Sequence, residues 1–162
     1  MTARPERPRP DDGERARLTE LLGRPPRGAV SVVRRGPDGA PAVIANGPLF
    51  EDGTPMPTRY WLVDPVLRDA VSRLEAAGGV REAEAAVDPD ALARAHRCYA
   101  AARDALVPAS HDGPRPGGGV GGTRRGVKCL HAHLAWWLVG GDDPVGEWTA
   151  RRLGLRREAS EQ

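Results

Sequence analysis

Three aspartate–proline pairs punctuate the chain beyond its first third, and they constrain the fold more than any other feature. They are Asp64-Pro65, Asp88-Pro89 and Asp143-Pro144. An aspartate carboxylate accepts hydrogen bonds from the free amides at a helix start. Proline suits the first helical position because its missing amide hydrogen has no partner there in any case. The pairs therefore predict three helix starts, at residues 65, 89 and 144.

Glycine pairs and apolar spacing set the remaining helix limits. The first predicted helix stops at Gly78-Gly79, a short segment covers 80–87, and the second helix runs to about Leu106. A further helix is predicted from about Gly126 to Val139. Near the beginning of the chain, an aspartate cap and a leucine stripe predict a helix that ends at Leu22.

Apolar, β-branched runs occur in one part of the sequence only. Residues 28–35 and 40–46 flank a Pro-Asp-Gly turn, which is typical of a β-hairpin. Residues 59–63 are predicted to form a third strand. The predicted fold class is therefore α+β, with a small antiparallel three-stranded sheet (about 28–63) covered by about four to five helices.

The length of 162 residues fits one domain with a real core. We expect a disordered tail at 1–10, a single domain at 11–155 and a solvated tail at 156–162. No apolar run approaches the roughly 18 residues of a membrane span, and no apolar segment of a signal peptide follows the basic start. Two cysteines make no disulfide framework. These features predict a cytoplasmic protein without a membrane partner.

The charges are nearly balanced, with 24 basic and 22 acidic residues and a net charge of +2. A dedicated nucleic-acid binder usually carries a clustered basic face, so we expect no nucleic-acid partner. Every basic residue except Lys128 is arginine. Lysine is a compact point charge and arginine a planar fork. Lys128 therefore either occupies a site where arginine could not replace it, or is a lysine that has persisted by chance.

The chemically richest segment is Gly117–His133, in which a glycine-rich loop leads into a predicted helix start. Helix starts bind anions through free amides, and glycines allow close approach of the backbone. Candidate binders of a phosphorylated or carboxylate ligand are Gly121, Gly122, Arg124, Arg125 and Lys128. A P-loop is rejected because Cys129 follows the lysine and no strand precedes the loop. The alternative is a flexible loop with solvated arginines.

Cys129, His131 and His133 follow at once. Cys129 and His133 share one face of a regular helix and form half of a zinc site, with further ligands required from elsewhere. The thiol could instead be a nucleophile, since nearby cations and a helix start lower a cysteine pKa. The third reading is a buried, inert cysteine with packed histidines.

Several blocks resemble an uncharacterised actinobacterial family, the domain of unknown function 501. They are the segment from Gly53 to Leu62, the segment from Ser72 to Gly78, the Ala95-His96…Tyr99 run and Val127-Lys-Cys-Leu-His131. The resemblance spans about residues 15–150 and assigns no activity. It matches Lys128, Cys129, His131 and His96, and relatives often carry Cys or His where this chain has Asp64. It therefore implies a metal set of Cys129, His131, His96 and Asp64, with zinc as the candidate ion.

Two functions remain open at this point. The first is a small metal- and/or phosphate-binding protein or enzyme, with its site at the glycine-rich loop and the Lys-Cys-Leu-His segment. The alternative is a non-catalytic adaptor, in which Trp136, Trp137 or Trp148 would mark a partner surface. The first requires that His96, Cys129 and His131 converge in space.

Overall fold

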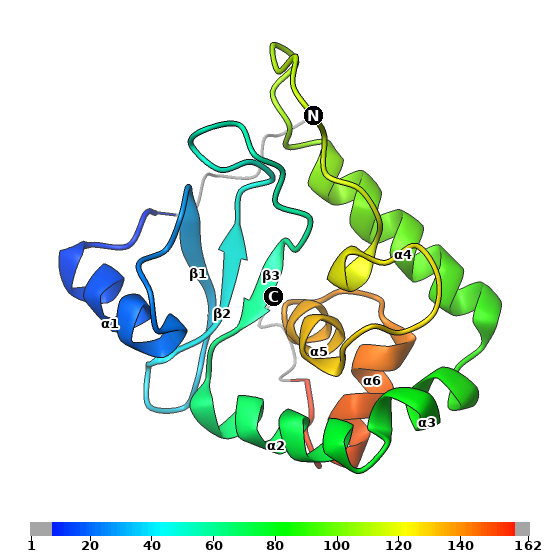
Figure 1. Cartoon of the computed structure of the whole chain (residues 1–162). Helices are drawn as coiled ribbons and strands as arrows, with labels where there is room; N and C mark the ends of the chain where they lie inside the picture. Colours follow the sequence, from blue (N-terminus) through cyan, green and yellow to red (C-terminus); the bar gives the residue numbers. More distant parts are fainter. Residues whose placement is uncertain (1–7, 158–162) are drawn as a thin grey trace.

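The computed structural model describes residues 8–157, and within them the chain forms one three-stranded sheet and six α-helices (Figure 1). The elements are α1 (Asp12–Leu22), β1 (Val30–Arg35), β2 (Pro41–Asn46), β3 (Tyr60–Leu62), α2 (Pro65–Ala76), α3 (Gly79–Ala86), α4 (Pro89–Asp104), a 3-10 turn η1 (Val120–Gly122), α5 (Leu130–Leu138) and α6 (Pro144–Arg152). The predicted α+β class and the three predicted strands are confirmed.

The sheet is antiparallel, in the order β1-β2-β3. Ile44 of the central strand pairs with Val32 on one side and with Trp61 on the other. All six residues of β2 are buried. A strand that is buried along its whole length requires cover on both faces of the sheet.

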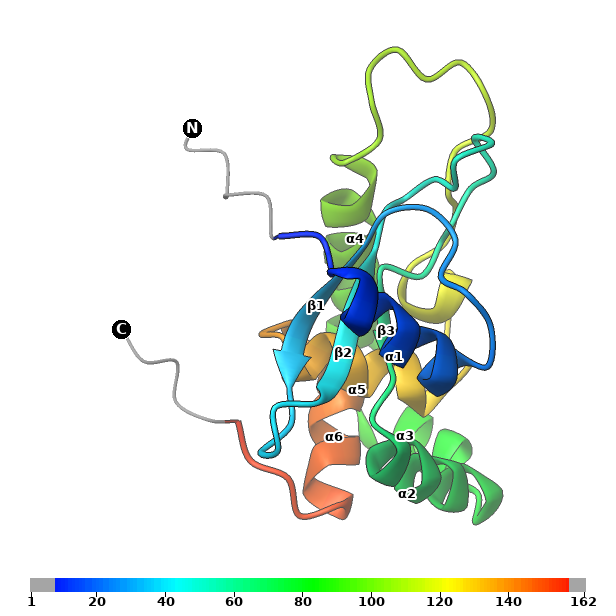
Figure 2. The same ribbon diagram turned by 90° about the vertical axis from the view of Figure 1, so that its left-hand side faces the viewer.

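The two faces carry different covers (Figures 1 and 2). On one face, Leu18 of α1 packs with Val30, Ile44 and Val63. On the other, Val43 and Leu62 join the larger core, to which α5 contributes Leu130 and Leu134. The helices after β3 therefore stand together on one side of the sheet, while α1 alone closes the opposite side.

The aspartate–proline pairs act as predicted. Asp64 accepts from the amide of Leu67 at 3.0 Å, and Asp88 accepts from that of Ala91 at 3.2 Å. Asp143 accepts from two amides at the start of α6. Each helix begins at the proline of its pair.

The start of α5 differs from the prediction. The helix begins at Leu130 rather than near Gly126, and Cys129 is its N-cap. Gly126 adopts a φ of 65°, in the left-handed region, and the next amide, of Val127, donates to the Glu84 carboxylate at 2.8 Å. This side-chain contact and the glycine turn hold 123–128 as an irregular segment, so the helix starts later.

The helices of the described part, 8–157, are all too short or too polar to cross a membrane. Of the predicted N-terminal tail, residues 8–10 carry no helix or strand, and 1–7 lie outside the described residues. Residues 158–162 of the predicted C-terminal tail lie outside them as well.

Candidate metal centre and anion pocket

The carboxylate of Glu75 lies at the N-terminus of α5. One oxygen, Oε2, accepts from the Leu130 amide at 2.8 Å, and the other, Oε1, lies 3.0 Å from Nδ1 of His131. Helix starts carry free amides and the positive end of the helix dipole, so a carboxylate is stabilised there. A carboxylate of the chain itself therefore occupies this helix start, where the glycine-rich segment predicts a bound anion.

Cys129 completes a group of three different ligand types. One ligand atom from each of Glu75, Cys129 and His131 can be chosen so that all lie within 4.8 Å of one another. All three side chains are half-buried. A thiol, an imidazole and a carboxylate at this spacing could hold a divalent ion with one position open, which is the ligand number of catalytic zinc sites.

Both ring nitrogens of His131 have partners. Nε2 lies 3.3 Å from the hydroxyl oxygen of Ser72 and 3.3 Å from the carbonyl oxygen of Arg68. With a proton on Nδ1, the ring donates to Glu75 and accepts from Ser72. With the proton on Nε2 instead, the ring donates to the Arg68 carbonyl and leaves Nδ1 free to bind a metal. Such a carbonyl contact is a common support for a metal-binding histidine.

The thiol of Cys129 is held against the helix that it caps, and its Sγ accepts from the Ala132 amide at 3.4 Å. Burial raises the pKa of this thiol, and the nearby Glu75 carboxylate adds to the effect, while Lys128 lowers it only slightly. This direction is opposite to the one that a nucleophilic cysteine requires, because the thiolate is the reactive form. A bound cation would reverse it, since coordination deprotonates a thiol.

The three side chains stand beside a pocket of about 550 Å³, of which Cys129 and His131 are lining residues. It opens where the end of α1, strand β3, helix α2 and the approach to α5 meet. The remaining lining residues are Leu22, Arg24, Thr58, Tyr60, Trp61, Leu62, Arg68, Ser72, Gly121, Lys128 and Ala132. The pocket therefore combines three cationic side chains with an apolar wall.

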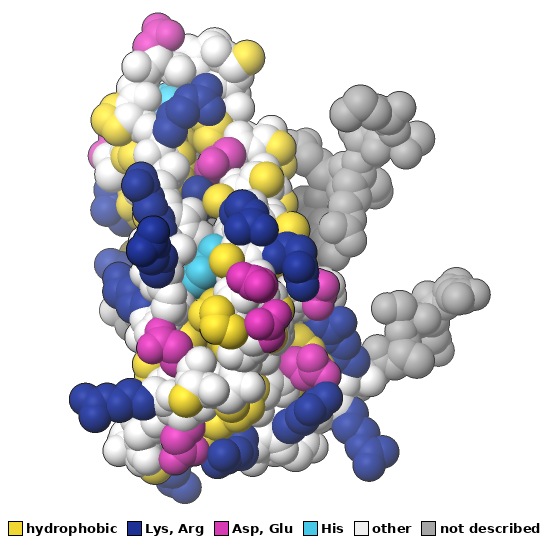
Figure 3. Space-filling view, turned by 90° about the vertical axis from the view of Figure 1, so that its right-hand side faces the viewer, with side chains coloured by type: hydrophobic (Ala, Val, Ile, Leu, Met, Phe, Trp, Pro, Cys, Tyr) yellow, Lys and Arg dark blue, Asp and Glu magenta, His cyan; other side chains and the backbone are white. Residues whose placement is uncertain are grey.

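The predicted anion-binding residues fall into two groups. Gly121 and Lys128 line the pocket, whereas Gly122, Arg124 and Arg125 are not among its lining residues. Arg124 and Arg125 are exposed, and on the face of the molecule shown in Figure 3 positive and negative side chains are intermingled. The pocket brings Lys128 together with Arg24 and Arg68, which the sequence pattern does not single out.

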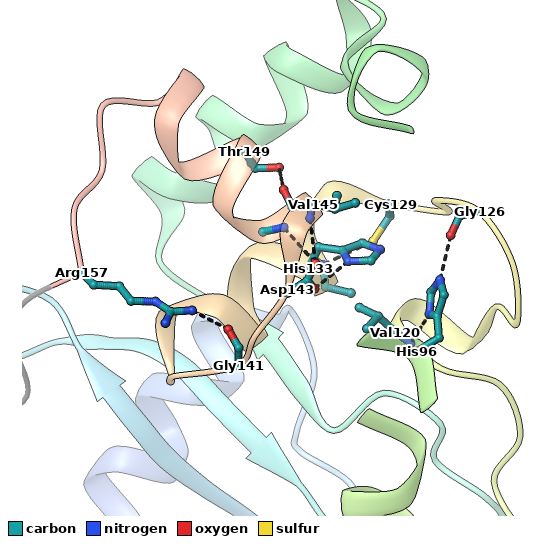
Figure 4. Close-up of polar contacts among 12 residues, drawn as sticks. His96, Val120, Gly126, Cys129, His133, Gly141, Asp143, Val145, Thr149 and Arg157 are labelled. Carbon is teal, nitrogen blue, oxygen red and sulfur yellow. Dashed lines mark hydrogen bonds and ion pairs between the residues drawn. The ribbon is translucent and has the colours of Figure 1, made fainter. Parts of the chain in front are cut away.

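His96 is not brought to the Glu75–Cys129–His131 group. Its Nδ1 accepts from the Val120 amide at 3.0 Å, so its Nε2 carries the proton and donates to the Gly126 carbonyl at 2.9 Å (Figure 4). Burial lowers the pKa of His96 and so favours this neutral form. The ring fixes the glycine-rich loop at two points and has no lone pair left for a metal. Arg103, also buried, holds the beginning of that loop through the Gly117 carbonyl.

Asp64 lies elsewhere too. Besides capping α2, one of its oxygens faces Gly36, in the turn between β1 and β2. The structure thus brings Cys129 and His131 together and supplies Glu75 as the third member, while Asp64 and His96 serve local structure.

His133 forms a second buried polar group with Asp143. Its Nδ1 lies 2.6 Å from Oδ2 of Asp143, and neither side chain is exposed (Figure 4). The other aspartate oxygen accepts from Val145 and Gly146. Nε2 of His133 is buried without a hydrogen-bond partner among residues 8–157. The pair joins α5 to the start of α6.

Sequence reasoning missed Glu75, Ser72 and Arg68. They lie three or four residues apart along α2, so they share one side of that helix. This spacing is a signal that could have been used, but nothing in the sequence indicates that this side faces Cys129.

The fold and the pocket together define a small α+β protein with a cation-lined pocket beside a cysteine–histidine–glutamate group. The chain belongs to the family described as "Protein of unknown function (DUF501)", whose model matches residues 32–151. That range includes Glu75, the pocket residues of β3 and α2, and all of α5. No curated protein and no solved structure gives a significant match to the chain.

Proposed function

We propose that this protein binds a single divalent metal ion, with zinc as the best candidate, through Glu75, Cys129 and His131. The observation that carries the proposal is the convergence of the three ligand atoms within 4.8 Å beside a pocket. A thiolate with an imidazole selects zinc over magnesium or calcium, which prefer oxygen ligands alone. The open position would face a small anionic ligand in the pocket, held by Lys128 and Arg68.

The contacts around the three ligands support this proposal. The Glu75 carboxylate would keep the Leu130 amide on Oε2 while Oε1 turns to the ion. His131 would bind through Nδ1 and keep the Arg68 carbonyl as the partner of its second nitrogen.

The alternative, a non-catalytic adaptor, has less support. The three tryptophans that would mark its partner surface are Trp136, Trp137 and Trp148. Trp137 is buried, whereas Trp136 and Trp148 are half-buried, Trp136 packed edge-on against Tyr99 and Trp148 beneath the Arg152 guanidinium. Protein–protein hot spots are usually aromatic side chains that a partner can reach.

Metal content and cobalt spectroscopy test the proposal. The protein is stripped with chelator, reloaded with zinc, dialysed and assayed for metal by mass spectrometry. We expect one ion per chain. Cobalt in place of zinc should give a thiolate-to-cobalt charge-transfer band, which reports on the sulfur ligand directly.

Three variants and one matched control locate the ion. Cys129→Ser, His131→Ala and Glu75→Gln should each weaken binding, and Cys129→Ser should also abolish the charge-transfer band. Cys98→Ser is the control, because Cys98 is exposed and lies on α4. Circular dichroism confirms that each variant is folded. The proposal fails if the wild-type protein takes up no ion, or if the folded Cys129→Ser variant binds as well as Cys98→Ser.

A further inference from the structure

The pocket beside the proposed centre is much larger than an inorganic anion requires. Its volume of about 550 Å³ lies within the range of roughly 300–1,000 Å³ typical of small-molecule sites. An ion bound by Cys129 and His131, or a free phosphate, would fill only part of it. The remaining space indicates an organic ligand.

One part of the wall is cationic, although the Glu75 carboxylate stands beside the pocket. Arg24, Arg68 and Lys128 come from three different segments, and no aspartate or glutamate is among the lining residues. Within residues 8–157, none of the three forms an ion pair with a carboxylate. Arg68 is held in place by a hydrogen bond from Nη1 to the Leu21 carbonyl at 3.0 Å, which leaves its other donors available. Such a wall favours a ligand with more than one negative charge.

The other part of the wall is apolar and largely aromatic. Tyr60, Trp61 and Leu62 contribute it from β3, together with Leu22 from the end of α1. Tyr60 and Trp61 are both half-buried, and as neighbours in a strand they point to opposite faces of the sheet, Trp61 toward the Leu18 cluster and Tyr60 toward Tyr99. The Arg24 guanidinium lies 5.9 Å from the centre of the Trp61 ring, where the cationic and aromatic parts meet. Aromatic side chains of this kind pack well against a planar ring.

We propose that the pocket binds a phosphate monoester whose organic part is a flat ring system, as in a nucleoside 5′-monophosphate or an aryl phosphate. The phosphate would lie among Lys128, Arg68 and Arg24, and the ring against Trp61. A phosphate monoester carries close to two negative charges at neutral pH and three acceptor oxygens, which suits three cations better than a single carboxylate. This inference rests on the pocket of the proposed function and not on the metal ion.

Binding is measured by calorimetry with four probes: adenosine 5′-monophosphate, phenyl phosphate, adenosine and inorganic phosphate. Each is titrated into metal-loaded protein and into protein kept in chelator. We expect the two esters to bind at least about tenfold more tightly than adenosine or phosphate alone, a difference of about 1.4 kcal/mol. The ester advantage should persist in chelator.

Variants separate the two parts of the wall. Lys128→Met should weaken both esters and phosphate by about tenfold, as expected for loss of one charge-assisted contact. The matched control is Arg94→Met, which removes an exposed charge on α4, away from the pocket lining. Trp61→Leu should weaken the esters and leave the affinity for phosphate unchanged.

The outcomes distinguish this inference from the metal proposal. Ester binding without any metal uptake supports the inference and overturns the metal centre. Metal uptake without ester binding overturns the inference and leaves the metal centre standing. The inference also fails if phosphate alone binds as tightly as the esters, or if Arg94→Met weakens the esters as much as Lys128→Met does.

Discussion

Replacement of Asp143 by alanine should destabilise the protein strongly, because this carboxylate serves two buried partners at once. It accepts from the Val145 and Gly146 amides at 2.9 and 3.0 Å, and it lies 2.6 Å from Nδ1 of His133. The side chains of Asp143 and His133 are both fully buried. In the variant, both the helix start and the imidazole lose their partner in a place that water does not reach.

The magnitude follows from these contacts. Loss of an N-cap costs about 1 kcal/mol. A buried imidazole without a partner for its donor adds about 1–3 kcal/mol, and breaking a buried pair by removal of one member typically costs about 3–5 kcal/mol. We therefore expect about 3–4 kcal/mol for Asp143→Ala. For a domain of this size that corresponds to a melting temperature lower by roughly 10 °C.

Urea unfolding, followed by circular dichroism, measures the effect. Asp88→Ala is the matched control, because Asp88 also caps a helix ahead of a proline but accepts a single amide and has no histidine partner. It should lose only about 1 kcal/mol. Equal losses for the two variants would refute the argument that the His133–Asp143 pair, rather than capping alone, stabilises the junction of α5 and α6.

Three further predictions concern the loop and the thiols. Burial lowers the pKa of His96 below its usual 6.5, so at pH values below 6.5 the unfolded chain binds more protons than the folded chain. The stability that neutral His96 contributes should therefore be complete above pH 6.5 and should be lost as the pH falls below it. Urea midpoints between pH 5 and 7.5 measure this loss, and His96→Gln should flatten the profile. Gly119→Ala should cost about 1–3 kcal/mol, since a Cβ there would lie 2.5 Å from His96 Nδ1, whereas Gly117→Ala meets nothing within 4 Å and should leave the melting temperature nearly unchanged. Iodoacetamide should label exposed Cys98 faster than Cys129 at neutral pH, as seen by peptide mass spectrometry, because burial shields Cys129 and raises its pKa; equal rates would contradict the described environment of Cys129.

The elements were predictable where local chemistry decides them. Each of the three Asp-Pro pairs caps a helix through contacts within its own first turn, and a Pro-Asp-Gly turn between β-branched runs closes a hairpin without distant help. The start of α5 was not predictable, because Glu84, some forty positions earlier in the chain, withdraws the Val127 amide from the helix. Local rules could not predict that both faces of the sheet are covered, although the apolar residues from Pro41 to Ala45 of β2 are consistent with it.

The candidate site was predictable in part, for the same reason. Cys129, His131 and Lys128 stand out by residue type within one short segment. His96 also stands out, yet its type cannot reveal that both ring nitrogens hold loop backbone. Glu75 lies in the Ser72–Gly78 block of the family resemblance, but its residue type gives no sign of a role, because a glutamate near the end of a helix is ordinarily solvated. Its role arises only when α2 and α5 pack together, which depends on the whole core.

The position of Glu75 also explains why we place the proposed anion site on the pocket wall rather than at the start of α5. A helix start has few free amides, and at α5 the Leu130 amide is taken by Glu75 while the Ala132 amide is taken by the Cys129 sulfur. A ligand from solution would compete with two groups of the same chain for these donors. The cations on the pocket wall face no such competition, since no carboxylate lines the pocket. In the proposed site, the helix start would therefore organise the candidate metal ligands, and an external anion would be recognised by Lys128 and the two arginines.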